Sequence, residues 1–389
     1  MSHMSHMSHM SHMSHRIIAN GPEDPLRVLL VGAGGMGRAW LRALAASPTA
    51  ALVGIVDLDL EAARDAARET GRRDLPVGTD AVRLAAETGA QAIVNVTVPA
   101  AHHPVTTAAL AAGLPVLGEK PVAPTVASAL SLAAAAEVTG ELFMVSQSRR
   151  WNPQVFALRS EVTERLGQLG GVTTEFYRAP RFGGFRDAMA YPLLVDMAIH
   201  PFDTARFLIG AEPVAVYCES YNPPWSWYAG DAAASAVFEF AGGVRYTYHG
   251  SWCQGGDETS WNGRWRLSGE KGTVLWDGET PPTTDPPAAP PLDPVRTPDG
   301  IAGALEVFTA ALRTGTVPMG EVHENILSLA MVEAAVESAR AGRRVLIDDV
   351  LAKAYEEAVR DERDDRVGAR LREWGSPRSA LSGTTTVPG

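Results

Sequence analysis

Short runs of apolar residues alternate with helical patterns between residues 27 and 147 of this 389-residue chain. The runs are aliphatic throughout and lack the polar–apolar alternation of a strand that has one face in water. Strands of this composition are buried on both faces, as they are when helices cover each side of a parallel sheet. The predicted strands are residues 27–31, 51–56, 92–96, 115–117 and 142–145, and the predicted helices lie near 36–46, 60–70, 105–112 and 126–139. This order predicts a doubly wound α/β domain of roughly 125 residues.

After Gln147 the strands change character, because polar residues there alternate with apolar or aromatic ones. Such a strand has one packed face and one free face, which is typical of an antiparallel sheet. The adjacent glycines Gly242 and Gly243 predict a hairpin turn between two of these strands. The predicted strands are residues 172–178, 214–219, 234–240, 244–248, 264–268 and 273–276, and helices return near 303–313 and 322–341. Residues 280–299 contain eight prolines, which predict an extended loop because proline lacks the N–H that a helix or central strand needs.

We therefore divide the chain into four segments. Residues 25–147 form the first α/β domain, and residues 148–352 form a second domain that includes the loop at 280–299. Residues 1–24 begin with five Met-Ser-His repeats and are predicted to be disordered, so the histidines of the repeat are excluded from any metal site. Residues 353–389 are predicted to form a charged helix and a disordered tail that begins at Ser376.

The composition excludes several classes of partner. The chain has 45 acidic and 34 basic residues, a formal net charge of −11, and no basic block, which argues against nucleic acid or an anionic membrane. No apolar run approaches the roughly 20 residues that span a bilayer, and the N-terminus lacks the regions of a signal peptide. Cys218 and Cys253 are too few for a disulfide framework, so we expect a reducing, cytoplasmic setting.

The sequence Gly-Ala-Gly-Gly-Met-Gly at 32–37 follows the first predicted strand and opens the first predicted helix. In this GxGxxG pattern Gly32 permits a tight turn, Gly34 lets the backbone approach a pyrophosphate, and Gly37 allows close packing of helix and strand. Asp57 ends the second predicted strand, where a carboxylate accepts hydrogen bonds from the adenosine ribose and repels a 2′-phosphate. The three residues after it include no arginine for such a phosphate, so NAD is favoured over NADP. The alternative is that the glycines form only a turn and Asp57 only caps a helix.

Two further groups of polar residues stand where chemistry is possible. Gly-Glu-Lys-Pro at 118–121 follows the strand at 115–117, at the carboxyl edge where open α/β sheets bind ligands; Lys120 there is alternatively a plain surface lysine. Asp196 and His200 are four residues apart, so a helix would place both on one face and let the carboxylate orient the imidazole. The alternative for this pair is a buried polar contact without a catalytic role.

Together these motifs resemble the glucose-fructose oxidoreductase / inositol dehydrogenase / MocA (Gfo/Idh/MocA) family over residues 26–350. The resemblance extends to Val-Pro-Ala-Ala-His-His at 98–103, Gln-Ser-Arg-Arg-Trp-Asn-Pro at 147–153 and Gly-Glu-Lys-Gly-Thr at 269–273. It implies a Rossmann domain followed by a C-terminal α/β domain with a large, open, mostly antiparallel sheet. It also implies NAD(P)-dependent hydride transfer at a secondary hydroxyl of a sugar, sugar derivative or inositol.

The resemblance also implies roles for individual residues. Lys120 corresponds to the family's substrate-orienting lysine, His200 to the acid/base that exchanges the hydroxyl proton, and Asp196 to the carboxylate of the same proton network. His103 matches the family's usual histidine better than His102 does. The implied cofactor-binding residues are Gly32, Gly34, Gly35, Met36, Gly37, Asp57, Pro99, His103, Glu119 and Lys120, and the implied substrate-binding residues are Lys120, Arg149, Tyr191, Asp196, His200 and Trp252. The chain departs from the family pattern at Ala198, often a glycine, and at Val98, commonly a threonine.

We therefore expect an NAD-dependent dehydrogenase that needs no metal, because Lys120 supplies the positive charge where an alkoxide develops. Two alternatives are a glycoside hydrolase that retains NAD and a ligand sensor that binds NAD(P) without turnover. Aromatic residues such as Tyr191 and Trp252 either stack on a small carbohydrate or cyclitol or simply pack the sheet. The open sheet, as the resemblance implies it, predicts a homodimer or homotetramer.

Overall fold

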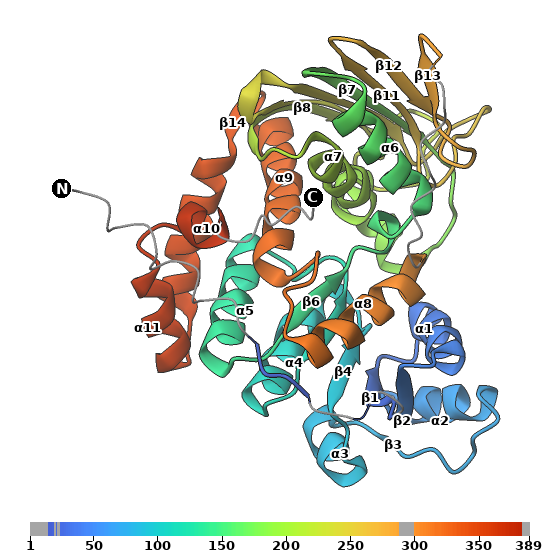
Figure 1. The fold of residues 1–389 in the computed structure, drawn as a ribbon, viewed down its shortest axis with the longest axis vertical. Coiled ribbons are helices and arrows are strands. Elements are labelled where there is room, and N and C mark those ends of the chain that lie inside the picture. The colour runs from blue at the N-terminus through green and yellow to red at the C-terminus, as the bar shows by residue number, and fades with distance from the viewer. Residues whose placement is uncertain (1–14, 19–20, 22–23, 288–298, 383–389) are drawn as a thin grey trace. The chain divides into compact units, whose positions relative to one another are not determined.

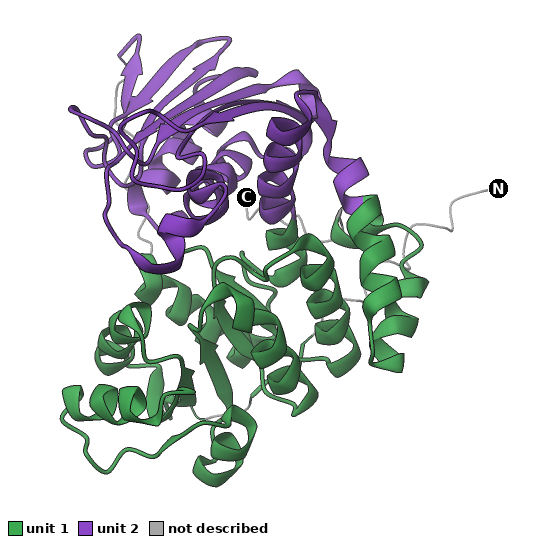
Figure 2. Cartoon of the chain, turned by 180° about the vertical axis from the view of Figure 1, so that it is seen from behind, with its two compact units in different colours: residues 1–148, 299–326, 352–389 green, residues 149–298, 327–351 purple. Residues whose placement is uncertain are grey.

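The computed structural model describes residues 15–18, 21, 24–287 and 299–382. The chain divides into two compact units, the first made of residues 1–148, 299–326 and 352–389 and the second of residues 149–298 and 327–351 (Figure 2). The predicted end of the first domain at residue 147 lies within one residue of this division. The predicted extent of the second domain differs from it, because residues 299–326 belong to the first unit.

The first unit is built on a six-stranded sheet in the order β3-β2-β1-β4-β5-β6, in which all neighbouring strands are parallel (Figure 1). The strands are β1 (Leu26–Val31), β2 (Ala50–Val56), β3 (Val77–Gly78), β4 (Ala92–Asn95), β5 (Val116–Glu119) and β6 (Phe143–Ser146). Every residue of β4, β5 and β6 is buried, as expected for a sheet covered on both faces. The strand order changes direction between β1 and β4, so the ligand-binding crevice of such a sheet lies at the carboxyl ends of these two strands.

The connecting helices are α1 (Gly35–Ala46), α2 (Leu60–Glu69), α3 (Ala81–Thr88), α4 (Pro99–Ala111) and α5 (Val126–Thr139). The apolar pattern predicts neither the two-residue strand β3 nor the helix α3. Local signals for α3 are nevertheless present, because Asp80 accepts a hydrogen bond from the Arg83 N–H and Gly89 ends the helix at a φ of 63°. α4 begins at Pro99 and not near residue 105, since proline suits the first turn of a helix.

Helices from the end of the chain complete the first unit. α8 (Gly300–Thr314) packs on α1 and β6, and α11 (Asp365–Glu373) packs on α5. α10 (Ile347–Asp361) precedes α11, and α12 (Pro377–Ser382) follows it. The prediction of disorder from residue 376 is therefore wrong as far as residue 382. Disorder is also wrong for part of 15–24, because Arg16 and Ile18 donate backbone hydrogen bonds to Gly140 and Leu312; residues 1–14 and 383–389 lie outside the described residues.

A buried group of charges, the His323 cluster, joins α5, α9 (Val322–Ala341) and the C-terminal helices of the first unit. His323 lies with Nδ1 2.8 Å from Glu321 Oε1 and Nε2 3.0 Å from Glu137 Oε1. Arg370 Nε and Trp374 Nε1 donate to the other Glu137 oxygen at 2.5 and 2.8 Å. Burial alone lowers the pKa of His323, but the two carboxylates outweigh burial and raise the pKa to about 10. The ring is therefore a cation held between two anions.

The second unit contains an eight-stranded sheet in the order β13-β12-β11-β7-β10-β9-β8-β14 (Figure 1). The strands are β7 (Leu169–Tyr177), β8 (Pro213–Tyr221), β9 (Ala233–Phe240), β10 (Arg245–Ser251), β11 (Arg264–Gly269), β12 (Gly272–Trp276), β13 (Thr283–Asp285) and β14 (Val345–Leu346). Only the central β7–β10 pair is parallel among the strand pairs of this sheet. The predicted loop at 280–299 contains the short edge strand β13, where proline is tolerated, and residues 288–298 lie outside the described residues.

Helices cover one face of this sheet. They are α6 (Pro153–Glu164), the π-helical turn η3 (Leu193–Met197) and α7 (Ile199–Ile209), with 3₁₀ turns at η1 (Ser148–Arg150), η2 (Gly184–Ala188) and η4 (Ala241–Gly243). Phe202 of α7 packs edge-on against Phe238, Tyr246 and Tyr248, with ring centroids 4.8, 6.2 and 5.3 Å away. These strand residues are the buried half of the alternation seen in the sequence.

The other face of the same sheet exposes apolar side chains in a cross-strand row. Tyr217, Val237 and Leu275 are 42%, 45% and 41% exposed. Val237 pairs with Tyr217 on β8 and with Thr247 on β10. The row then passes through the polar residues Thr247, Thr173 and Arg266 before it reaches Leu275, so apolar and polar side chains are mixed along it. Within the described residues, none of the helices combines the length and apolar character that crossing a membrane requires.

Candidate functional site

The glycine-rich loop at 32–37 is closed toward the protein and open on its other side. Gly32 has a φ of 107°, and a Cβ on it would lie 2.7 Å from the Val96 carbonyl oxygen. A Cβ on Gly37 would overlap the Gly32 carbonyl, so α1 can approach β1 this closely only without a side chain there. A Cβ on Gly34 would meet nothing within 4 Å, and Gly34, Gly35 and Met36 are exposed. The loop therefore fits a pyrophosphate against the N–H groups that begin α1.

Asp57, directly after β2, forms a hydrogen bond with the backbone of this loop. Its Oδ2 accepts a hydrogen bond from the Ala33 N–H at 2.7 Å, and its Oδ1 accepts one from the Asp59 N–H at 2.9 Å. Asp57 is only partly buried, so its remaining lone pairs can accept from ribose hydroxyls. The structure thus brings Asp57 to the glycine loop, as the sequence predicts.

Arg38 is a further residue of the same loop, which sequence patterns do not indicate. Arg38 lies on α1, one residue after the glycine motif, and donates to the Ala33 carbonyl oxygen at 2.7 Å and to Glu69 of α2 at 2.9 Å. An arginine therefore does stand near Asp57, although the residues that follow Asp57 contain none. Arg38 forms an ion pair with Glu69. Its guanidinium is therefore less available to bind the 2′-phosphate of NADP.

The 119–121 turn lies at the carboxyl end of β5. Glu119 is buried, and its carboxylate accepts from Trp40 Nε1 of α1 at 2.9 Å and from the Lys120 N–H at 3.1 Å. Burial raises the pKa of Glu119, which the hydrogen bond from Trp40 partly offsets. Lys120 is half-buried, and the Lys120–Pro121 peptide bond is cis. Trp40 is a further residue of this site that sequence patterns do not indicate.

The structure assigns the histidine beside this turn differently from the sequence. His102 is buried, with Nδ1 2.6 Å from the Pro121 carbonyl oxygen and Nε2 3.0 Å from that of Thr97. His103 instead points toward α5, where Nε2 lies 3.4 Å from Ser131 Oγ. His102, and not His103, is therefore the histidine that contacts the 119–121 turn, and a cofactor role for His103 stays a prediction. Burial lowers the pKa of His102, so the ring is neutral at pH 7.

The predicted Asp196–His200 pair lies in the second unit on a backbone that is not one regular helix. Asp196 belongs to the π-helical turn η3, and α7 begins only at Ile199, so the expectation of a single helical face is corrected. Asp196 Oδ2 accepts from Arg186 Nε at 2.5 Å, an ion pair that the sequence analysis does not anticipate. His200 is 7% exposed in the first turn of α7. π-helical turns occur often at functional sites, which fits this location.

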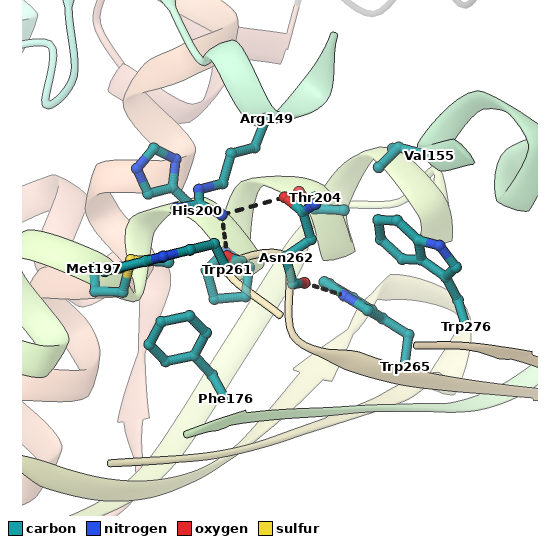
Figure 3. A pocket seen from close by; sticks show the side chains of 11 residues that line it. Arg149, Val155, Phe176, Met197, His200, Thr204, Trp261, Asn262, Trp265 and Trp276 are labelled. Carbon is teal, nitrogen blue, oxygen red and sulfur yellow. Dashed lines mark hydrogen bonds between the residues drawn. The ribbon is translucent and has the colours of Figure 1, made fainter. Parts of the chain in front are cut away.

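His200 lines a cavity of the second unit that we call the Arg149 cavity (Figure 3). Arg149 donates to the Trp261 carbonyl oxygen and to Asn262 Oδ1, and its guanidinium lies 5.8 Å from the centre of the Trp261 ring. Burial lowers the pKa of Arg149 to about 10. The other lining residues are Val155, Phe176, Met197, Pro201, Thr204, Trp265 and Trp276.

The remaining predicted substrate residues lie elsewhere. Trp252 is 1% exposed and packs between Tyr228 and Phe182, with ring centroids 6.0 Å away on each side, so the structure contradicts its role in stacking on a substrate. Tyr191 is partly buried beneath Arg340, whose guanidinium lies 5.2 Å from the ring centre. Neither residue lines the Arg149 cavity. No group of three or more potential metal ligands occurs among the described residues.

Two family models match the chain. One, described as an oxidoreductase family with an NAD-binding Rossmann fold, matches residues 26–147, and the other, the GFO/IDH/MocA C-terminal domain, matches residues 163–275. The first match covers the glycine loop, Asp57 and Lys120, and the second covers Asp196 and His200. The first unit therefore contains an NAD-binding domain.

Relatives along most of the chain agree with these matches. Inositol 2-dehydrogenase of Rhizobium meliloti (strain 1021) is 27% identical, over 83% of this chain and 99% of its own length. D-apiose dehydrogenase of Paraburkholderia graminis is 27% identical, over 84% of this chain and 90% of its own length. An oxidoreductase from Agrobacterium radiobacter, crystallised with NAD+, L-tartaric acid and magnesium, has the same fold: its TM-score is 0.75 at 20% identity, over 84% of this chain and 100% of that one.

Proposed function

Because the chain belongs to the Gfo/Idh/MocA family of oxidoreductases, which bind NAD through a Rossmann domain, we propose that it transfers a hydride between a secondary hydroxyl of a sugar, sugar derivative or inositol and NAD. The observation that carries this proposal is the glycine loop braced by Asp57, on the same sheet edge as Lys120. Bound NAD supplies the acceptor for the hydride. The relatives named as inositol and apiose dehydrogenases support the substrate class.

The residues that hold the cofactor follow from the first unit alone. Gly34 and Gly35 leave room for the pyrophosphate, and the N–H groups at the start of α1 donate to it. Asp57 accepts from the adenosine ribose. Glu119 fixes the backbone at Lys120 through its hydrogen bond to the Lys120 N–H and is itself fixed by Trp40. Pro99 is the first residue of α4, which follows β4 at the sheet edge where the cofactor binds.

The proton and the developing charge are handled by side chains of this chain. His200 accepts the hydroxyl proton as the carbon is oxidised, since imidazole is the side chain suited to this near neutral pH. Lys120 places its ammonium where the oxygen becomes an alkoxide, and a cation there stabilises the transition state by about 3 kcal/mol. Asp196, which is paired with Arg186, takes part with His200 in the transfer of this proton.

The test is a panel of sugars and inositols incubated with purified protein and NAD, with NADH absorbance as the readout. The expected result is net NADH accumulation with at least one polyol. Products without net NADH would indicate an NAD-retaining hydrolase, and NAD binding without any turnover would indicate a sensor; either result contradicts the proposal.

Self-association through the second unit is part of this proposal. The sheet face opposite α7 exposes Tyr217, Val237 and Leu275, in one cross-strand row with Thr247, Thr173 and Arg266. Covering such a face removes apolar surface from water, which favours a symmetric dimer or tetramer. Cys218 and Cys253 are buried free thiols, which supports a reducing, cytoplasmic setting.

A further inference from the structure

The Arg149 cavity contains a positive charge that is not balanced by any carboxylate of the described residues. Among the residues that the structure describes, no carboxylate pairs with Arg149, whose hydrogen bonds go to the neutral acceptors Trp261 O and Asn262 Oδ1. The neighbouring Arg178, which also lies over the Trp261 ring, is paired with Glu258 at 2.9 Å. Arg150, the next residue in the chain, is buried in a two-bond ion pair with Asp203. Both of these arginines therefore have an acidic partner, and Arg149 has none.

The surroundings make this charge costly. Aromatic and aliphatic side chains form most of the lining, and they remove Arg149 from water enough to lower its pKa to about 10. The side chain still carries its charge at neutral pH. A cation without a counter-charge in apolar surroundings costs free energy, which a ligand anion would offset.

The cavity also holds an unused hydrogen-bond donor. Trp265 Nε1 donates to the Asn262 carbonyl oxygen at 2.7 Å, whereas the Nε1 of Trp276 is buried without a hydrogen-bond partner among the described residues. Both tryptophans are 3% exposed, while Trp261 at the other end of the lining is 36% exposed. The lining thus includes a cation at Arg149 and, at Trp276, an N–H without a partner among the described residues, two groups that suit an oxyanion.

We propose that the Arg149 cavity binds a carboxylate, so that the preferred substrate of this enzyme is a sugar acid or another polyhydroxy acid. The assignment of that acid as substrate rests on the proposed dehydrogenase function, because His200 lines the same cavity; the carboxylate site itself does not. A planar monoanion suits one guanidinium among aromatic walls. A phosphate brings up to two charges and more hydration, which a single arginine in an apolar lining offsets poorly.

The test compares ligands that differ in charge and little else. D-glucuronate and D-glucose, D-galacturonate and D-galactose, and D-glucose 6-phosphate are titrated at one ionic strength into the NAD-loaded full chain, with tryptophan fluorescence as the readout. Acetate is titrated as well, because it carries a carboxylate but has no sugar ring that must fit the site. Three tryptophans line the cavity, so occupation changes their emission. At least one uronate is expected to bind about tenfold more tightly than its neutral parent.

Variants assign the effect to the cavity. Arg149→Gln is expected to abolish the preference for the acid, Arg149→Lys to retain part of it, and Trp276→Phe to weaken it. Arg264→Gln is the matched control, because Arg264 is an exposed arginine of the same unit that pairs with Asp257; it should keep the wild-type preference. Thermal unfolding of each variant shows whether it is folded. If Arg149→Gln is not folded, the comparison of wild type with Arg149→Lys still tests the inference.

Three results would overturn the inference: no carboxylate binding better than its neutral parent, an acid preference that survives in Arg149→Gln, or glucose 6-phosphate binding best through Arg149. A neutral polyol that reduces NAD with a higher kcat/KM than any of the acids, in wild type and Arg149→Gln alike, would also overturn it while supporting the proposed function. Conversely, uronate binding through Arg149 without any NAD reduction would support the carboxylate site and contradict the dehydrogenase.

Discussion

Among single side chains, the proposed reaction depends most on the charge of Lys120. Lys120→Met keeps much of the volume and removes the ammonium at the sheet edge. We expect kcat to fall by roughly 100-fold or more, with the dissociation constant for NAD nearly unchanged. Steady-state kinetics and NAD titration measure both values. Lys271→Met, in the turn between β11 and β12, is the control; a kcat for Lys120→Met equal to that of this control would remove Lys120 from the mechanism.

The choice between NAD and NADP is expected to depend on Asp57. Asp57→Ser removes a negative charge beside the loop while Arg38 stays nearby on α1. We expect the ratio of the NADP and NAD dissociation constants to fall by about tenfold, because the repulsion of a 2′-phosphate is lost. Fluorescence titration with each reduced nucleotide measures the ratio. Asp65→Ser, on the exposed side of α2, should leave it unchanged; an unaltered ratio in Asp57→Ser would mean that the ribose is recognised by other groups.

The sequence predicts those site residues whose requirement is local. Gly32 and Gly37 follow from the need for a tight turn and close helix packing, and both requirements are met in the structure. Which of His102 and His103 contacts the 119–121 turn depends on the phase of α4, which starts at Pro99, so the motif alone does not indicate that it is His102. Trp252 fails for a different reason: alternation shows that one face of a strand is packed, but not that Tyr228 and Phe182 enclose this ring.

Among helices and strands, the long apolar elements are predictable and the short or irregular ones are not. A two-residue strand such as β3 has too few positions to show a period. The π-helical turn η3 has five backbone residues whose hydrogen bonds follow a spacing that no apolar pattern encodes. This turn sets where Asp196 lies relative to α7, so the geometry of the candidate site could not be predicted from a four-residue spacing.

The His323 cluster predicts how the C-terminal helices respond to pH. The pKa of His323 is about 10 in the folded chain and near 6.5 when unfolded, so its protonation stabilises the fold fully below pH 6.5 and loses this effect as the pH rises through 10. Glu321 and Glu137 contact the ring, and Arg370 is paired with Glu137.

His323→Gln is expected to lower the free energy of unfolding of the first unit by about 3 kcal/mol at pH 7, because the buried carboxylates lose their cation. The difference between wild type and this variant should shrink between pH 7 and pH 10. Chemical denaturation at each pH measures the difference. A gap that stays constant with pH would show that the ring is neutral in the folded chain.

For the molecule as a whole, the exposed apolar row of the second unit predicts an oligomer. Val237→Arg places a charge in the middle of that row, between Tyr217 and Thr247. We expect the wild type to be a dimer or tetramer and the variant a monomer, since an unpaired charge in an apolar interface is costly. Light scattering after size exclusion measures the mass. Ala86→Arg, on an exposed position of α3, is the control; a Val237→Arg variant of wild-type mass would exclude this face from assembly.

The two-part organisation of the chain is visible in the sequence, but its full pattern is not. The change from aliphatic runs to alternating strands after Gln147 lies within one residue of the division between the two units. The return of residues 299–326 and 352–382 to the first unit depends on long-range packing, such as that of α8 on α1 and α11 on α5. Helical periodicity shows that these segments need a partner surface, without showing which sheet or helix supplies it.

The docking of α11 on α5 has a consequence for biosynthesis. A ribosome that has finished α5 must still add more than 200 residues before α11 emerges, on the order of 10–40 seconds at ordinary elongation rates. Throughout that interval α5 lacks the helix that packs on it, which leaves an alanine-rich surface of the nascent Rossmann domain exposed to solvent. Chaperones that bind nascent chains are expected to bind this surface. A premature stop codon before α11 would leave the surface of α5 exposed in the finished chain.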